Sequence, residues 1–77
     1  MAKYHRNGEY IITETHFDRF SSRWEGYVLA QNERTKTWVT WYFLVRDGEW
    51  DYNHGHYFDQ ERDARADFYH RISCMYA

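Results

Sequence analysis

An Asp-Gly pair at positions 47–48 constrains the fold of this 77-residue chain more than any other feature. It separates two runs rich in β-branched and aromatic residues, Thr37–Arg46 and Glu49–Phe58. Such a pair between two such runs is typical of a β-hairpin with a two-residue turn. Counted outward from that turn, the predicted strand pairs are Arg46–Glu49, Val45–Trp50, Phe43–Tyr52, Trp41–His54 and Val39–His56.

A second hairpin precedes the first. Residues Arg23–Gln31 read as a strand, and the polar segment Asn32–Thr35 reads as the loop that returns the chain. The predicted pairs are Ala30–Thr37, Val28–Val39, Gly26–Trp41 and Trp24–Phe43. Both registers place the same residues on one apolar face, with His54 and His56 beside them: Trp24, Val28, Ala30, Val39, Trp41, Phe43, Val45, Trp50, Tyr52 and Phe58.

The two ends of the chain have different patterns. A polar lead-in over residues 1–8 ends in Asn-Gly, and Glu9–His16 is β-branched and reads as a first strand, either at the edge of the meander or across its face. From Asp59, a good N-cap, the period changes to that of a helix. Acidic Glu61 and Asp63 fall in its first turn, and its apolar positions are Ala64, Phe68, Ile72 and Met75 or Tyr76.

These elements predict an α+β fold. We expect an antiparallel β-meander of three to four strands packed on one C-terminal helix (β-β-β-β-α), forming a single domain over residues 1–77. The helix should bury its stripe on the apolar face of the meander. Aromatic residues make up 22% of the chain and supply the large side chains that so small a core requires.

Charge and cysteine content limit the classes of function. The net charge is −2, distributed so that residues 1–46 are basic by two charges and residues 47–77 acidic by four. One cysteine, Cys74, cannot close an intramolecular disulfide, and neither a signal peptide nor an apolar run long enough to cross a bilayer is visible. We therefore expect a cytoplasmic protein with no membrane partner.

No catalytic motif stands out. The sequence contains no Gly-rich phosphate loop, no nucleophile elbow and no Cys/His pairing, so we predict a protein that is not an enzyme and that needs no cofactor. His54 and His56 share one strand face and could hold a metal with a carboxylate. Partly buried histidines satisfied by neighbouring groups are commoner, and no metal site is predicted.

The face of the meander opposite the predicted helix is the candidate binding surface. Its residues are Tyr27, Leu29, Trp38, Thr40, Tyr42, Leu44 and Tyr57. The solvent face of an antiparallel sheet normally reads polar. Either part of this face is covered, by the first strand folding over it (Tyr10, Ile12) or by Phe17 and Phe20, or the face binds a partner. The candidate aromatic anchors are Tyr27, Trp38, Tyr42 and Tyr57, and alanine at Trp38 should abolish binding without unfolding the protein.

An acidic ridge on the helix is the second candidate contact. Asp59, Asp63 and Asp67 are four residues apart and share one side of the helix, facing away from its apolar stripe. Such a ridge is either a solubilising helix face or a surface for a basic partner.

Two other functions remain open. The aromatic face could stack bases of single-stranded nucleic acid, although the acidic residues around it make direct nucleic-acid binding improbable. It could also pair with its own copy in a structural or regulatory homodimer. Steep loss of binding with salt would favour the first, and concentration-dependent sedimentation the second.

The chain also resembles a known class. Its length, its lack of proline, its aromatic meander and the helix segment Ala64–Arg71 behind Phe58-Asp59 are similar to small single-domain proteins of phages and mobile elements, in particular the anti-CRISPR class. The resemblance implies a non-enzymatic inhibitor, phage-encoded and acting in the host cytoplasm. Such an inhibitor would occlude or trap a larger nucleoprotein complex, a CRISPR effector, with the acidic ridge entering a basic channel.

Overall fold

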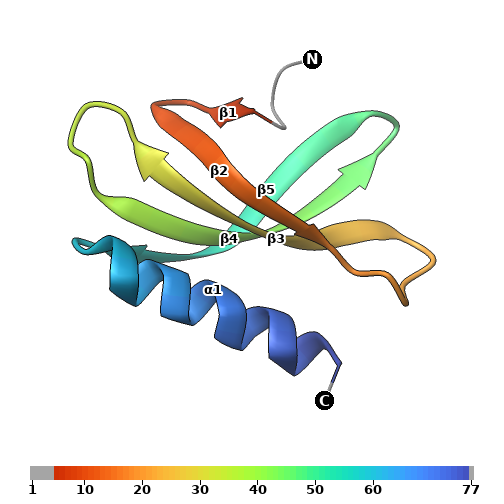
Figure 1. Cartoon of the computed structure of the whole chain (residues 1–77). Helices are drawn as coiled ribbons and strands as arrows, with labels where there is room; N and C mark the ends of the chain where they lie inside the picture. The colour runs from red at the N-terminus through yellow and green to blue at the C-terminus, as the bar shows by residue number, and fades with distance from the viewer. Residues whose placement is uncertain (1–4, 77) are drawn as a thin grey trace.

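A computed structural model describes residues 5–76, which form one antiparallel sheet and one helix (Figure 1). The elements are β1 (Arg6–Asn7), β2 (Tyr10–Phe17), β3 (Trp24–Asn32), β4 (Trp38–Arg46), β5 (Glu49–Phe58) and α1 (Glu61–Met75). The strands lie in chain order, so β1 and β5 are the edges. The predicted α+β meander with a C-terminal helix is confirmed. The first predicted strand joins the edge of the meander, and β1 adds two residues from the lead-in, whose residues 1–4 lie outside the described part.

The predicted turn between β4 and β5 is present. Asp47 and Gly48 both have positive φ, 53° and 80°, as a type I′ turn requires. The first strand pairs after the turn, from Arg46–Glu49 through Phe43–Tyr52, are those predicted. The Asp-Gly pair therefore sets both the turn and the register next to it.

Farther from the turn, a bulge in β5 makes the predicted pairing wrong. The register shifts between Tyr42 and Thr40, at His54-Gly55, where His54 has a φ of 55°. Val39 consequently pairs with Tyr57 rather than with His56. An extra residue in one strand moves every later side chain of that strand to the other face of the sheet. His56, Tyr57 and Phe58 therefore each lie on the face opposite to the predicted one.

The β3–β4 register is also displaced, by two residues. Val28 pairs with Trp41 instead of Val39, because β3 continues to Asn32. The Asn32 Oδ1 accepts hydrogen bonds from the backbone N–H groups of Arg34 and Thr35, each at 2.9 Å, and so holds the loop one residue farther along the chain than predicted. A shift of two residues leaves every side chain on its predicted face.

The inner face of the sheet is covered by the sheet itself. Its buried centre is Val28, Ala30, Val39, Trp41 and Phe43. The sheet curls so far that β2 and β5, which are not neighbouring strands, cross over one another (Figure 1), and their side chains meet across this face. The ring of Tyr10 lies 6.4 Å from that of Tyr57, and the ring of Phe17 lies 5.8 Å from that of Trp50.

Helix α1 packs on the opposite face, which we call the helix face. There, Leu29 and Trp38 of the sheet and Ala64 and Phe68 of α1 form a second buried cluster. The prediction that α1 covers the Val28 and Trp41 face is therefore wrong. Both faces of the sheet are apolar, and they differ in curvature. The concave face is closed by the curl of the sheet, and α1 packs on the convex face (Figure 1).

The helix begins one residue later than expected. Its N-cap is Gln60, not Asp59, and no side chain caps it. Glu61 and Asp63 lie in the first turn as predicted, and Ala64 and Phe68 are its buried residues. In the described part of the chain, no helix has the length and hydropathy needed to cross a membrane.

Candidate functional site

Exposed aromatic rings gather where β2 ends and β3 begins. Phe17 is 42% exposed, Phe20 78% and Trp24 66%, and Tyr76 follows α1 with 37%. We call these four residues the aromatic end. Trp24 was predicted to lie in the core. Its pairing with Val45 places it on the inner side of the sheet, but it lies outside the buried cluster of that face.

The local sequence fixes the backbone of this region. The Asp18 Oδ1 accepts a hydrogen bond from the Phe20 N–H at 3.0 Å, and the Ser21 Oγ accepts one from the Arg23 N–H at 3.0 Å. Such side-chain turns hold a short loop in one conformation. The rings are therefore presented from an ordered backbone.

The end of α1 contacts this loop through Phe20. The ring of Tyr76 lies 5.2 Å from that of Phe20 in an edge-on arrangement. Its hydroxyl lies 2.7 Å from the His16 Nε2, which connects the helix end to β2. The aromatic end thus combines three parts of the chain that are distant in sequence.

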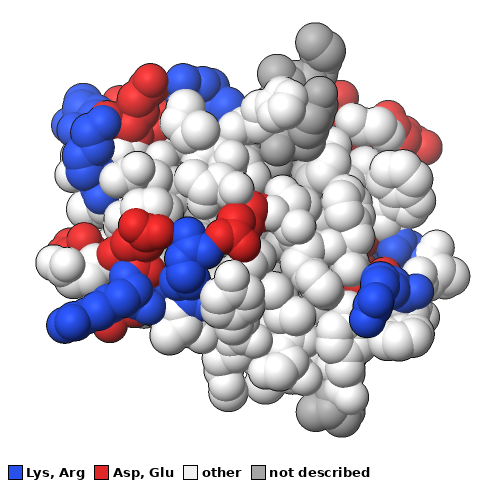
Figure 2. Space-filling view, in the orientation of Figure 1, with Lys and Arg blue, Asp and Glu red and all other residues white. Residues whose placement is uncertain are grey.

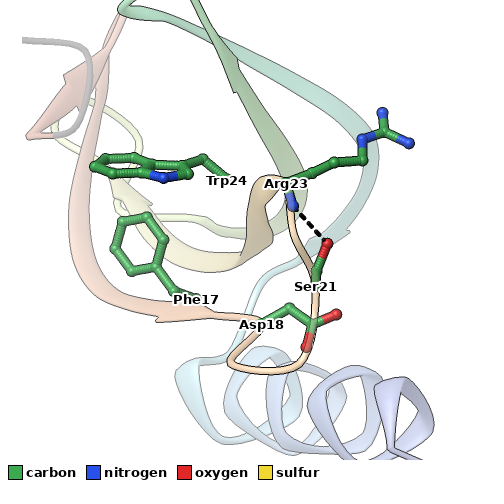
Figure 3. Close-up of a pocket in the computed structure, with 5 residues that line it drawn as sticks. All are labelled: Phe17, Asp18, Ser21, Arg23 and Trp24. Carbon is green, nitrogen blue, oxygen red and sulfur yellow. Dashed lines mark hydrogen bonds between the residues drawn. The ribbon is translucent and has the colours of Figure 1, made fainter.

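A pocket of about 330 Å³ opens beside these rings. It is lined by Phe17, Asp18, Ser21, Arg23 and Trp24. Figure 3 shows the two rings on one side, Asp18 below them, and the Arg23 side chain extending away from Trp24. The rings of Phe17 and Trp24 are edge-on, 6.0 Å apart, so the pocket has an aromatic wall, and the Asp18 carboxylate points away from the two rings (Figure 3).

A polar network borders the pocket on the helix face. The Ser21 hydroxyl donates to the Glu25 carboxylate at 2.6 Å, and the Tyr42 hydroxyl donates to its other oxygen. The bonds from Ser21 and Tyr42 lower the pKa of Glu25. Burial, followed by the bond to Glu25, raises the pKa of Tyr42 to about 12. Glu25 therefore stays ionised and Tyr42 protonated near neutral pH.

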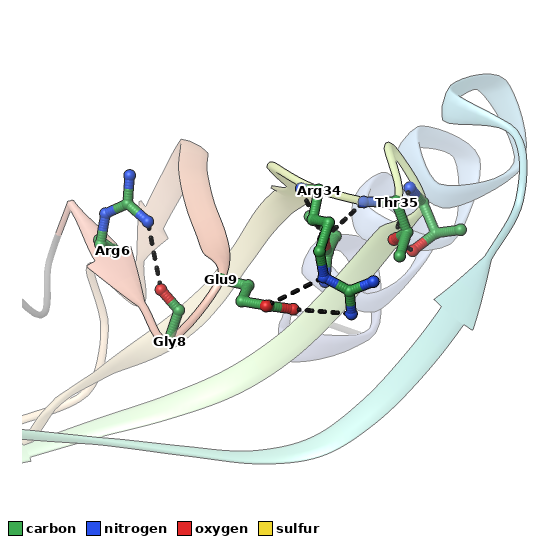
Figure 4. Close-up of polar contacts among 7 residues, drawn as sticks. Arg6, Gly8, Glu9, Arg34 and Thr35 are labelled. Atoms are coloured by element: carbon green, nitrogen blue, oxygen red, sulfur yellow. Dashed lines mark hydrogen bonds and ion pairs between the residues drawn. The ribbon is translucent and has the colours of Figure 1, made fainter.

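Charged residues concentrate at the other end of the molecule. In Figure 2 the larger group of them gathers at the left, over the β3–β4 loop and the start of α1, a smaller group lies at the right, and the lower part of this view is largely uncharged. At the charged end, Arg34 binds Glu9 through two nitrogens at 3.1 and 3.2 Å (Figure 4). Arg6 lies 2.9 Å from Glu33. These ion pairs join the β1–β2 hairpin to the β3–β4 loop.

The structure brings three of the four predicted aromatic anchors together, but on the helix face and not on an open surface. Trp38 is only 9% exposed, beneath α1, and Tyr27 packs beside it under the Arg71 guanidinium, 4.7 Å from the ring centroid. Tyr42 is half-buried and lies 5.8 Å from Tyr27. The prediction that these residues point away from the helix is wrong.

Tyr57 is exposed, but on the other side of the sheet. The bulge places it on the inner side, 63% exposed, with its ring over Gly55. The Trp41 indole N–H donates to its hydroxyl at 3.4 Å. It therefore forms no common surface with Tyr27 or Tyr42.

The predicted acidic ridge is divided. Asp59 and Asp63 are exposed, but Asp67 faces the sheet, where it accepts a hydrogen bond from the buried Thr40 hydroxyl at 2.6 Å. The Asp67 carboxylate also lies 3.0 Å from the His56 Nδ1. The expected outward direction of all three carboxylates is wrong for Asp67, because the apolar stripe of α1 is flanked by polar residues that reach the sheet.

His54 and His56 do not form a pair. The His54 ring lies 6.1 Å from that of Tyr42, whereas His56 contacts Asp67. Within residues 5–76, no three His, Cys, Asp or Glu side chains are grouped as metal ligands.

Sequence reasoning missed Phe17, Phe20 and Trp24 as surface residues. The available signal was local: two phenylalanines three apart in a segment ending in Ser-Ser, directly before a tryptophan. Aromatic residues in a connecting loop are candidates for binding because loops run over the surface. No protein-family model, curated protein or solved structure matches this chain.

Proposed function

We propose that this chain is a non-enzymatic protein-binding module whose contact surface is the aromatic end. The observation that carries the proposal is the exposure of Phe17, Phe20 and Trp24 within one short segment, with Phe17 and Trp24 in contact and lining a pocket. Tryptophan, tyrosine and arginine dominate the energetics of protein interfaces, and exposed apolar patches beside concave surfaces are typical of binding sites.

Order in the loop supports this proposal. A ring that is already fixed loses less conformational entropy on binding than a mobile one. Phe17 is held by edge-on contacts to Phe43 at 5.2 Å and to Trp50 at 5.8 Å, and the loop backbone is held by Asp18 and Ser21. A partner would therefore meet a preformed surface.

The chemistry of the pocket supports binding rather than catalysis. Its one hydroxyl, on Ser21, donates to Glu25 and accepts from a backbone N–H. A carboxylate with a lowered pKa is a weak general base, so Glu25 is poorly suited to activate Ser21. The arrangement fits a structural role for both groups.

The resemblance to anti-CRISPR proteins suggests a class of partner. We propose a larger nucleoprotein complex, specifically a CRISPR effector, that the chain would occlude or trap. The exposed Asp59 and Asp63 would supply a second, electrostatic contact to a basic channel, while the buried Trp38 would not take part. Expression of the protein in CRISPR-immune bacteria should then restore phage plaques, and unchanged immunity against every effector type tested would reject this partner class.

The test of the binding surface is a comparative affinity capture. Tagged wild-type protein and the variants Trp24→Ala and Tyr69→Ala are incubated with the same lysate and compared by quantitative mass spectrometry. Tyr69 is the matched control, since it is 52% exposed on α1 and outside the aromatic end. A partner bound by the aromatic end should be retained by wild type and Tyr69→Ala and reduced at least about tenfold by Trp24→Ala.

Folding must be preserved for this comparison. Circular dichroism and thermal unfolding of Trp24→Ala should match the wild type closely, because the side chain is mostly exposed. Equal recovery of each specific partner by all three proteins would reject the aromatic end as the contact surface.

A further inference from the structure

The second half of strand β2 lies at an open edge of the sheet. β1 pairs with β2 only at Tyr10 and Ile11, and the Ile12 N–H donates to the His5 carbonyl at 2.8 Å. Figure 1 accordingly shows β1 beside the first part of β2. From Ile12 to Phe17, no strand within residues 5–76 pairs with the outer side of β2.

The hydrogen bonds at the two ends of this segment show which backbone groups face outward. In an antiparallel ladder, residues that bond to one neighbouring strand alternate with residues whose N–H and C=O point to the other side. The Ile12 N–H points to the β1 side, whereas the Asp18 N–H donates to the Glu25 carbonyl on the β3 side at 2.8 Å. The bulge in β2 reverses the alternation once and reconciles the two. Counted back from Asp18, Thr15 and Phe17 direct their N–H and C=O groups outward.

These outward groups are accessible and adjoin the aromatic end. Thr15 and Phe17 are both exposed. Apart from the ladder to β3, the described part of the chain provides no hydrogen bond to their backbone groups. Phe17 also lines the pocket together with Trp24. The open edge therefore leads directly to the pocket.

The other edge strand, β5, is less suited to adding a strand. Its regular half carries the acidic residues Glu49 and Asp51, and its bulge interrupts the rest. Charges and bulges are features that protect sheet edges from pairing with another chain. In β2 the bulge precedes the open segment, whose one carboxylate, on Glu14, is engaged by α1.

We propose that the protein partner binds by adding an extended segment to the outer edge of β2, alongside Thr15 and Phe17. Donors and acceptors that alternate at strand spacing recognise the main chain of an extended peptide, and adjacent pockets then select its side chains. A segment paired at Phe17 brings an apolar side chain to the pocket lined by Phe17 and Trp24. This inference rests on the proposed function and adds the form in which the partner is bound.

Amide hydrogen exchange of the free, full-length protein, measured by NMR, tests whether the edge is open. The Thr15 and Phe17 amides should exchange at least about tenfold faster than the amide of His16, which lies between them and faces β3. Raising the protein concentration should not change these rates. Exchange at Thr15 and Phe17 as slow as at His16 would show a closed edge, and slowing with concentration would show that a second copy occupies it. Either result would overturn the proposal.

Binding is tested with a peptide probe, an acetylated and amidated pentapeptide of valine and threonine around a central phenylalanine. It should shift the Thr15 and Phe17 amide resonances with millimolar affinity. The same peptide with N-methylated backbone nitrogens has no main-chain donors, so it should bind at least about fivefold more weakly. Equal affinity of the two peptides would contradict pairing through the main chain.

Proline variants use the alternation of the backbone groups. Thr15→Pro removes an outward N–H and no bond to β3, so it should stay folded and lose the probe, whereas Thr15→Val should bind like the wild type. His16→Pro removes a bond to β3 and should lower the melting temperature far more than Thr15→Pro, with His16→Ala as the control for its side chain. Undiminished probe binding by Thr15→Pro, or equal melting temperatures of the two proline variants, would reject the open edge.

The two proposals fail separately. If Trp24→Ala loses the captured partner while Thr15→Pro retains it in full, the aromatic end is a binding surface and strand addition is wrong. If Thr15→Pro loses the partner while wild type and Trp24→Ala capture it equally, the edge of β2 binds the partner and the proposed surface is wrong.

Discussion

At the scale of single residues, Gly26 permits a close approach between β2 and β3. A Cβ at this position would lie 1.8 Å from the His16 carbonyl oxygen, so the backbones of β2 and β3 approach closely only because Gly26 has no side chain. Gly26 pairs with both Phe17 and Phe43, whose rings meet at 5.2 Å. The glycine thereby allows Phe17 to pack at the rim, where it forms part of the aromatic end.

Gly26→Ala should therefore destabilise the protein by about 3 kcal/mol, at the upper end for overpacking. Urea unfolding followed by circular dichroism measures the change. Gly8→Ala is the matched control, because Gly8 has a φ of 61° and open space around it, and it should cost only about 1 kcal/mol. Equal losses in the two variants would show that the close approach at Gly26 is not required.

Ionisation of tyrosine should make the free energy of unfolding depend on pH in the alkaline range. Burial raises the pKa of Tyr52 to about 12 from the ordinary value of 10. A group whose pKa is raised on folding contributes stability below its unfolded pKa and loses it as pH rises through the folded one. Stability should therefore fall between about pH 10 and 12, and Tyr52→Phe should lessen that fall. A fall as steep in Tyr52→Phe as in the wild type would contradict the assignment to Tyr52.

At the scale of elements, the sequence predicted the strands, the Asp-Gly turn and the helix, but not the two irregular strands. Strand parity was correct for Val28, Ala30, Val39 and Trp41, and it failed after the bulge at His54-Gly55. Gly55 was an available signal, because an isolated glycine inside a strand is typical of a bulge, but counting residues outward from the turn did not use it. A second irregularity between Ile12 and Glu14 has the same effect in β2.

The choice of face for α1 yields a direct prediction. Trp38 is buried under the helix with Phe68, so Trp38→Ala should reduce stability by about 3–5 kcal/mol, as large aromatic truncations in cores do. Trp24→Ala should cost about 1 kcal/mol or less, because its ring is mostly exposed. Thermal unfolding of both variants provides the comparison. If Trp38→Ala were as stable as the wild type, Trp38 would not be part of the core, and the assignment of α1 to the helix face would be wrong.

At the scale of the whole molecule, the chain has two apolar sheet faces but one helix. Sequence parity defined both faces, yet it could not predict which one the helix covers, since that depends on how strongly the sheet curls. The curl encloses the inner face through Tyr10–Tyr57 and Phe17–Trp50 contacts. Most of the exposed aromatic side chains in the described part of the chain therefore lie at one end of the molecule, with Tyr57 and Tyr69 exposed elsewhere. The predicted anchors Trp38 and Tyr27 are packed against α1 instead.

Oxidative footprinting of the tryptophans tests this account most directly. In the free protein, Trp24 should be modified many times faster than the buried Trp38 and Trp41, and it should be protected once a captured partner is bound. Tyr69 should keep its reactivity in the complex. Slow modification of Trp24 in the free protein, or unchanged reactivity of Trp24 in the complex, would contradict the claim that the aromatic end is the binding surface.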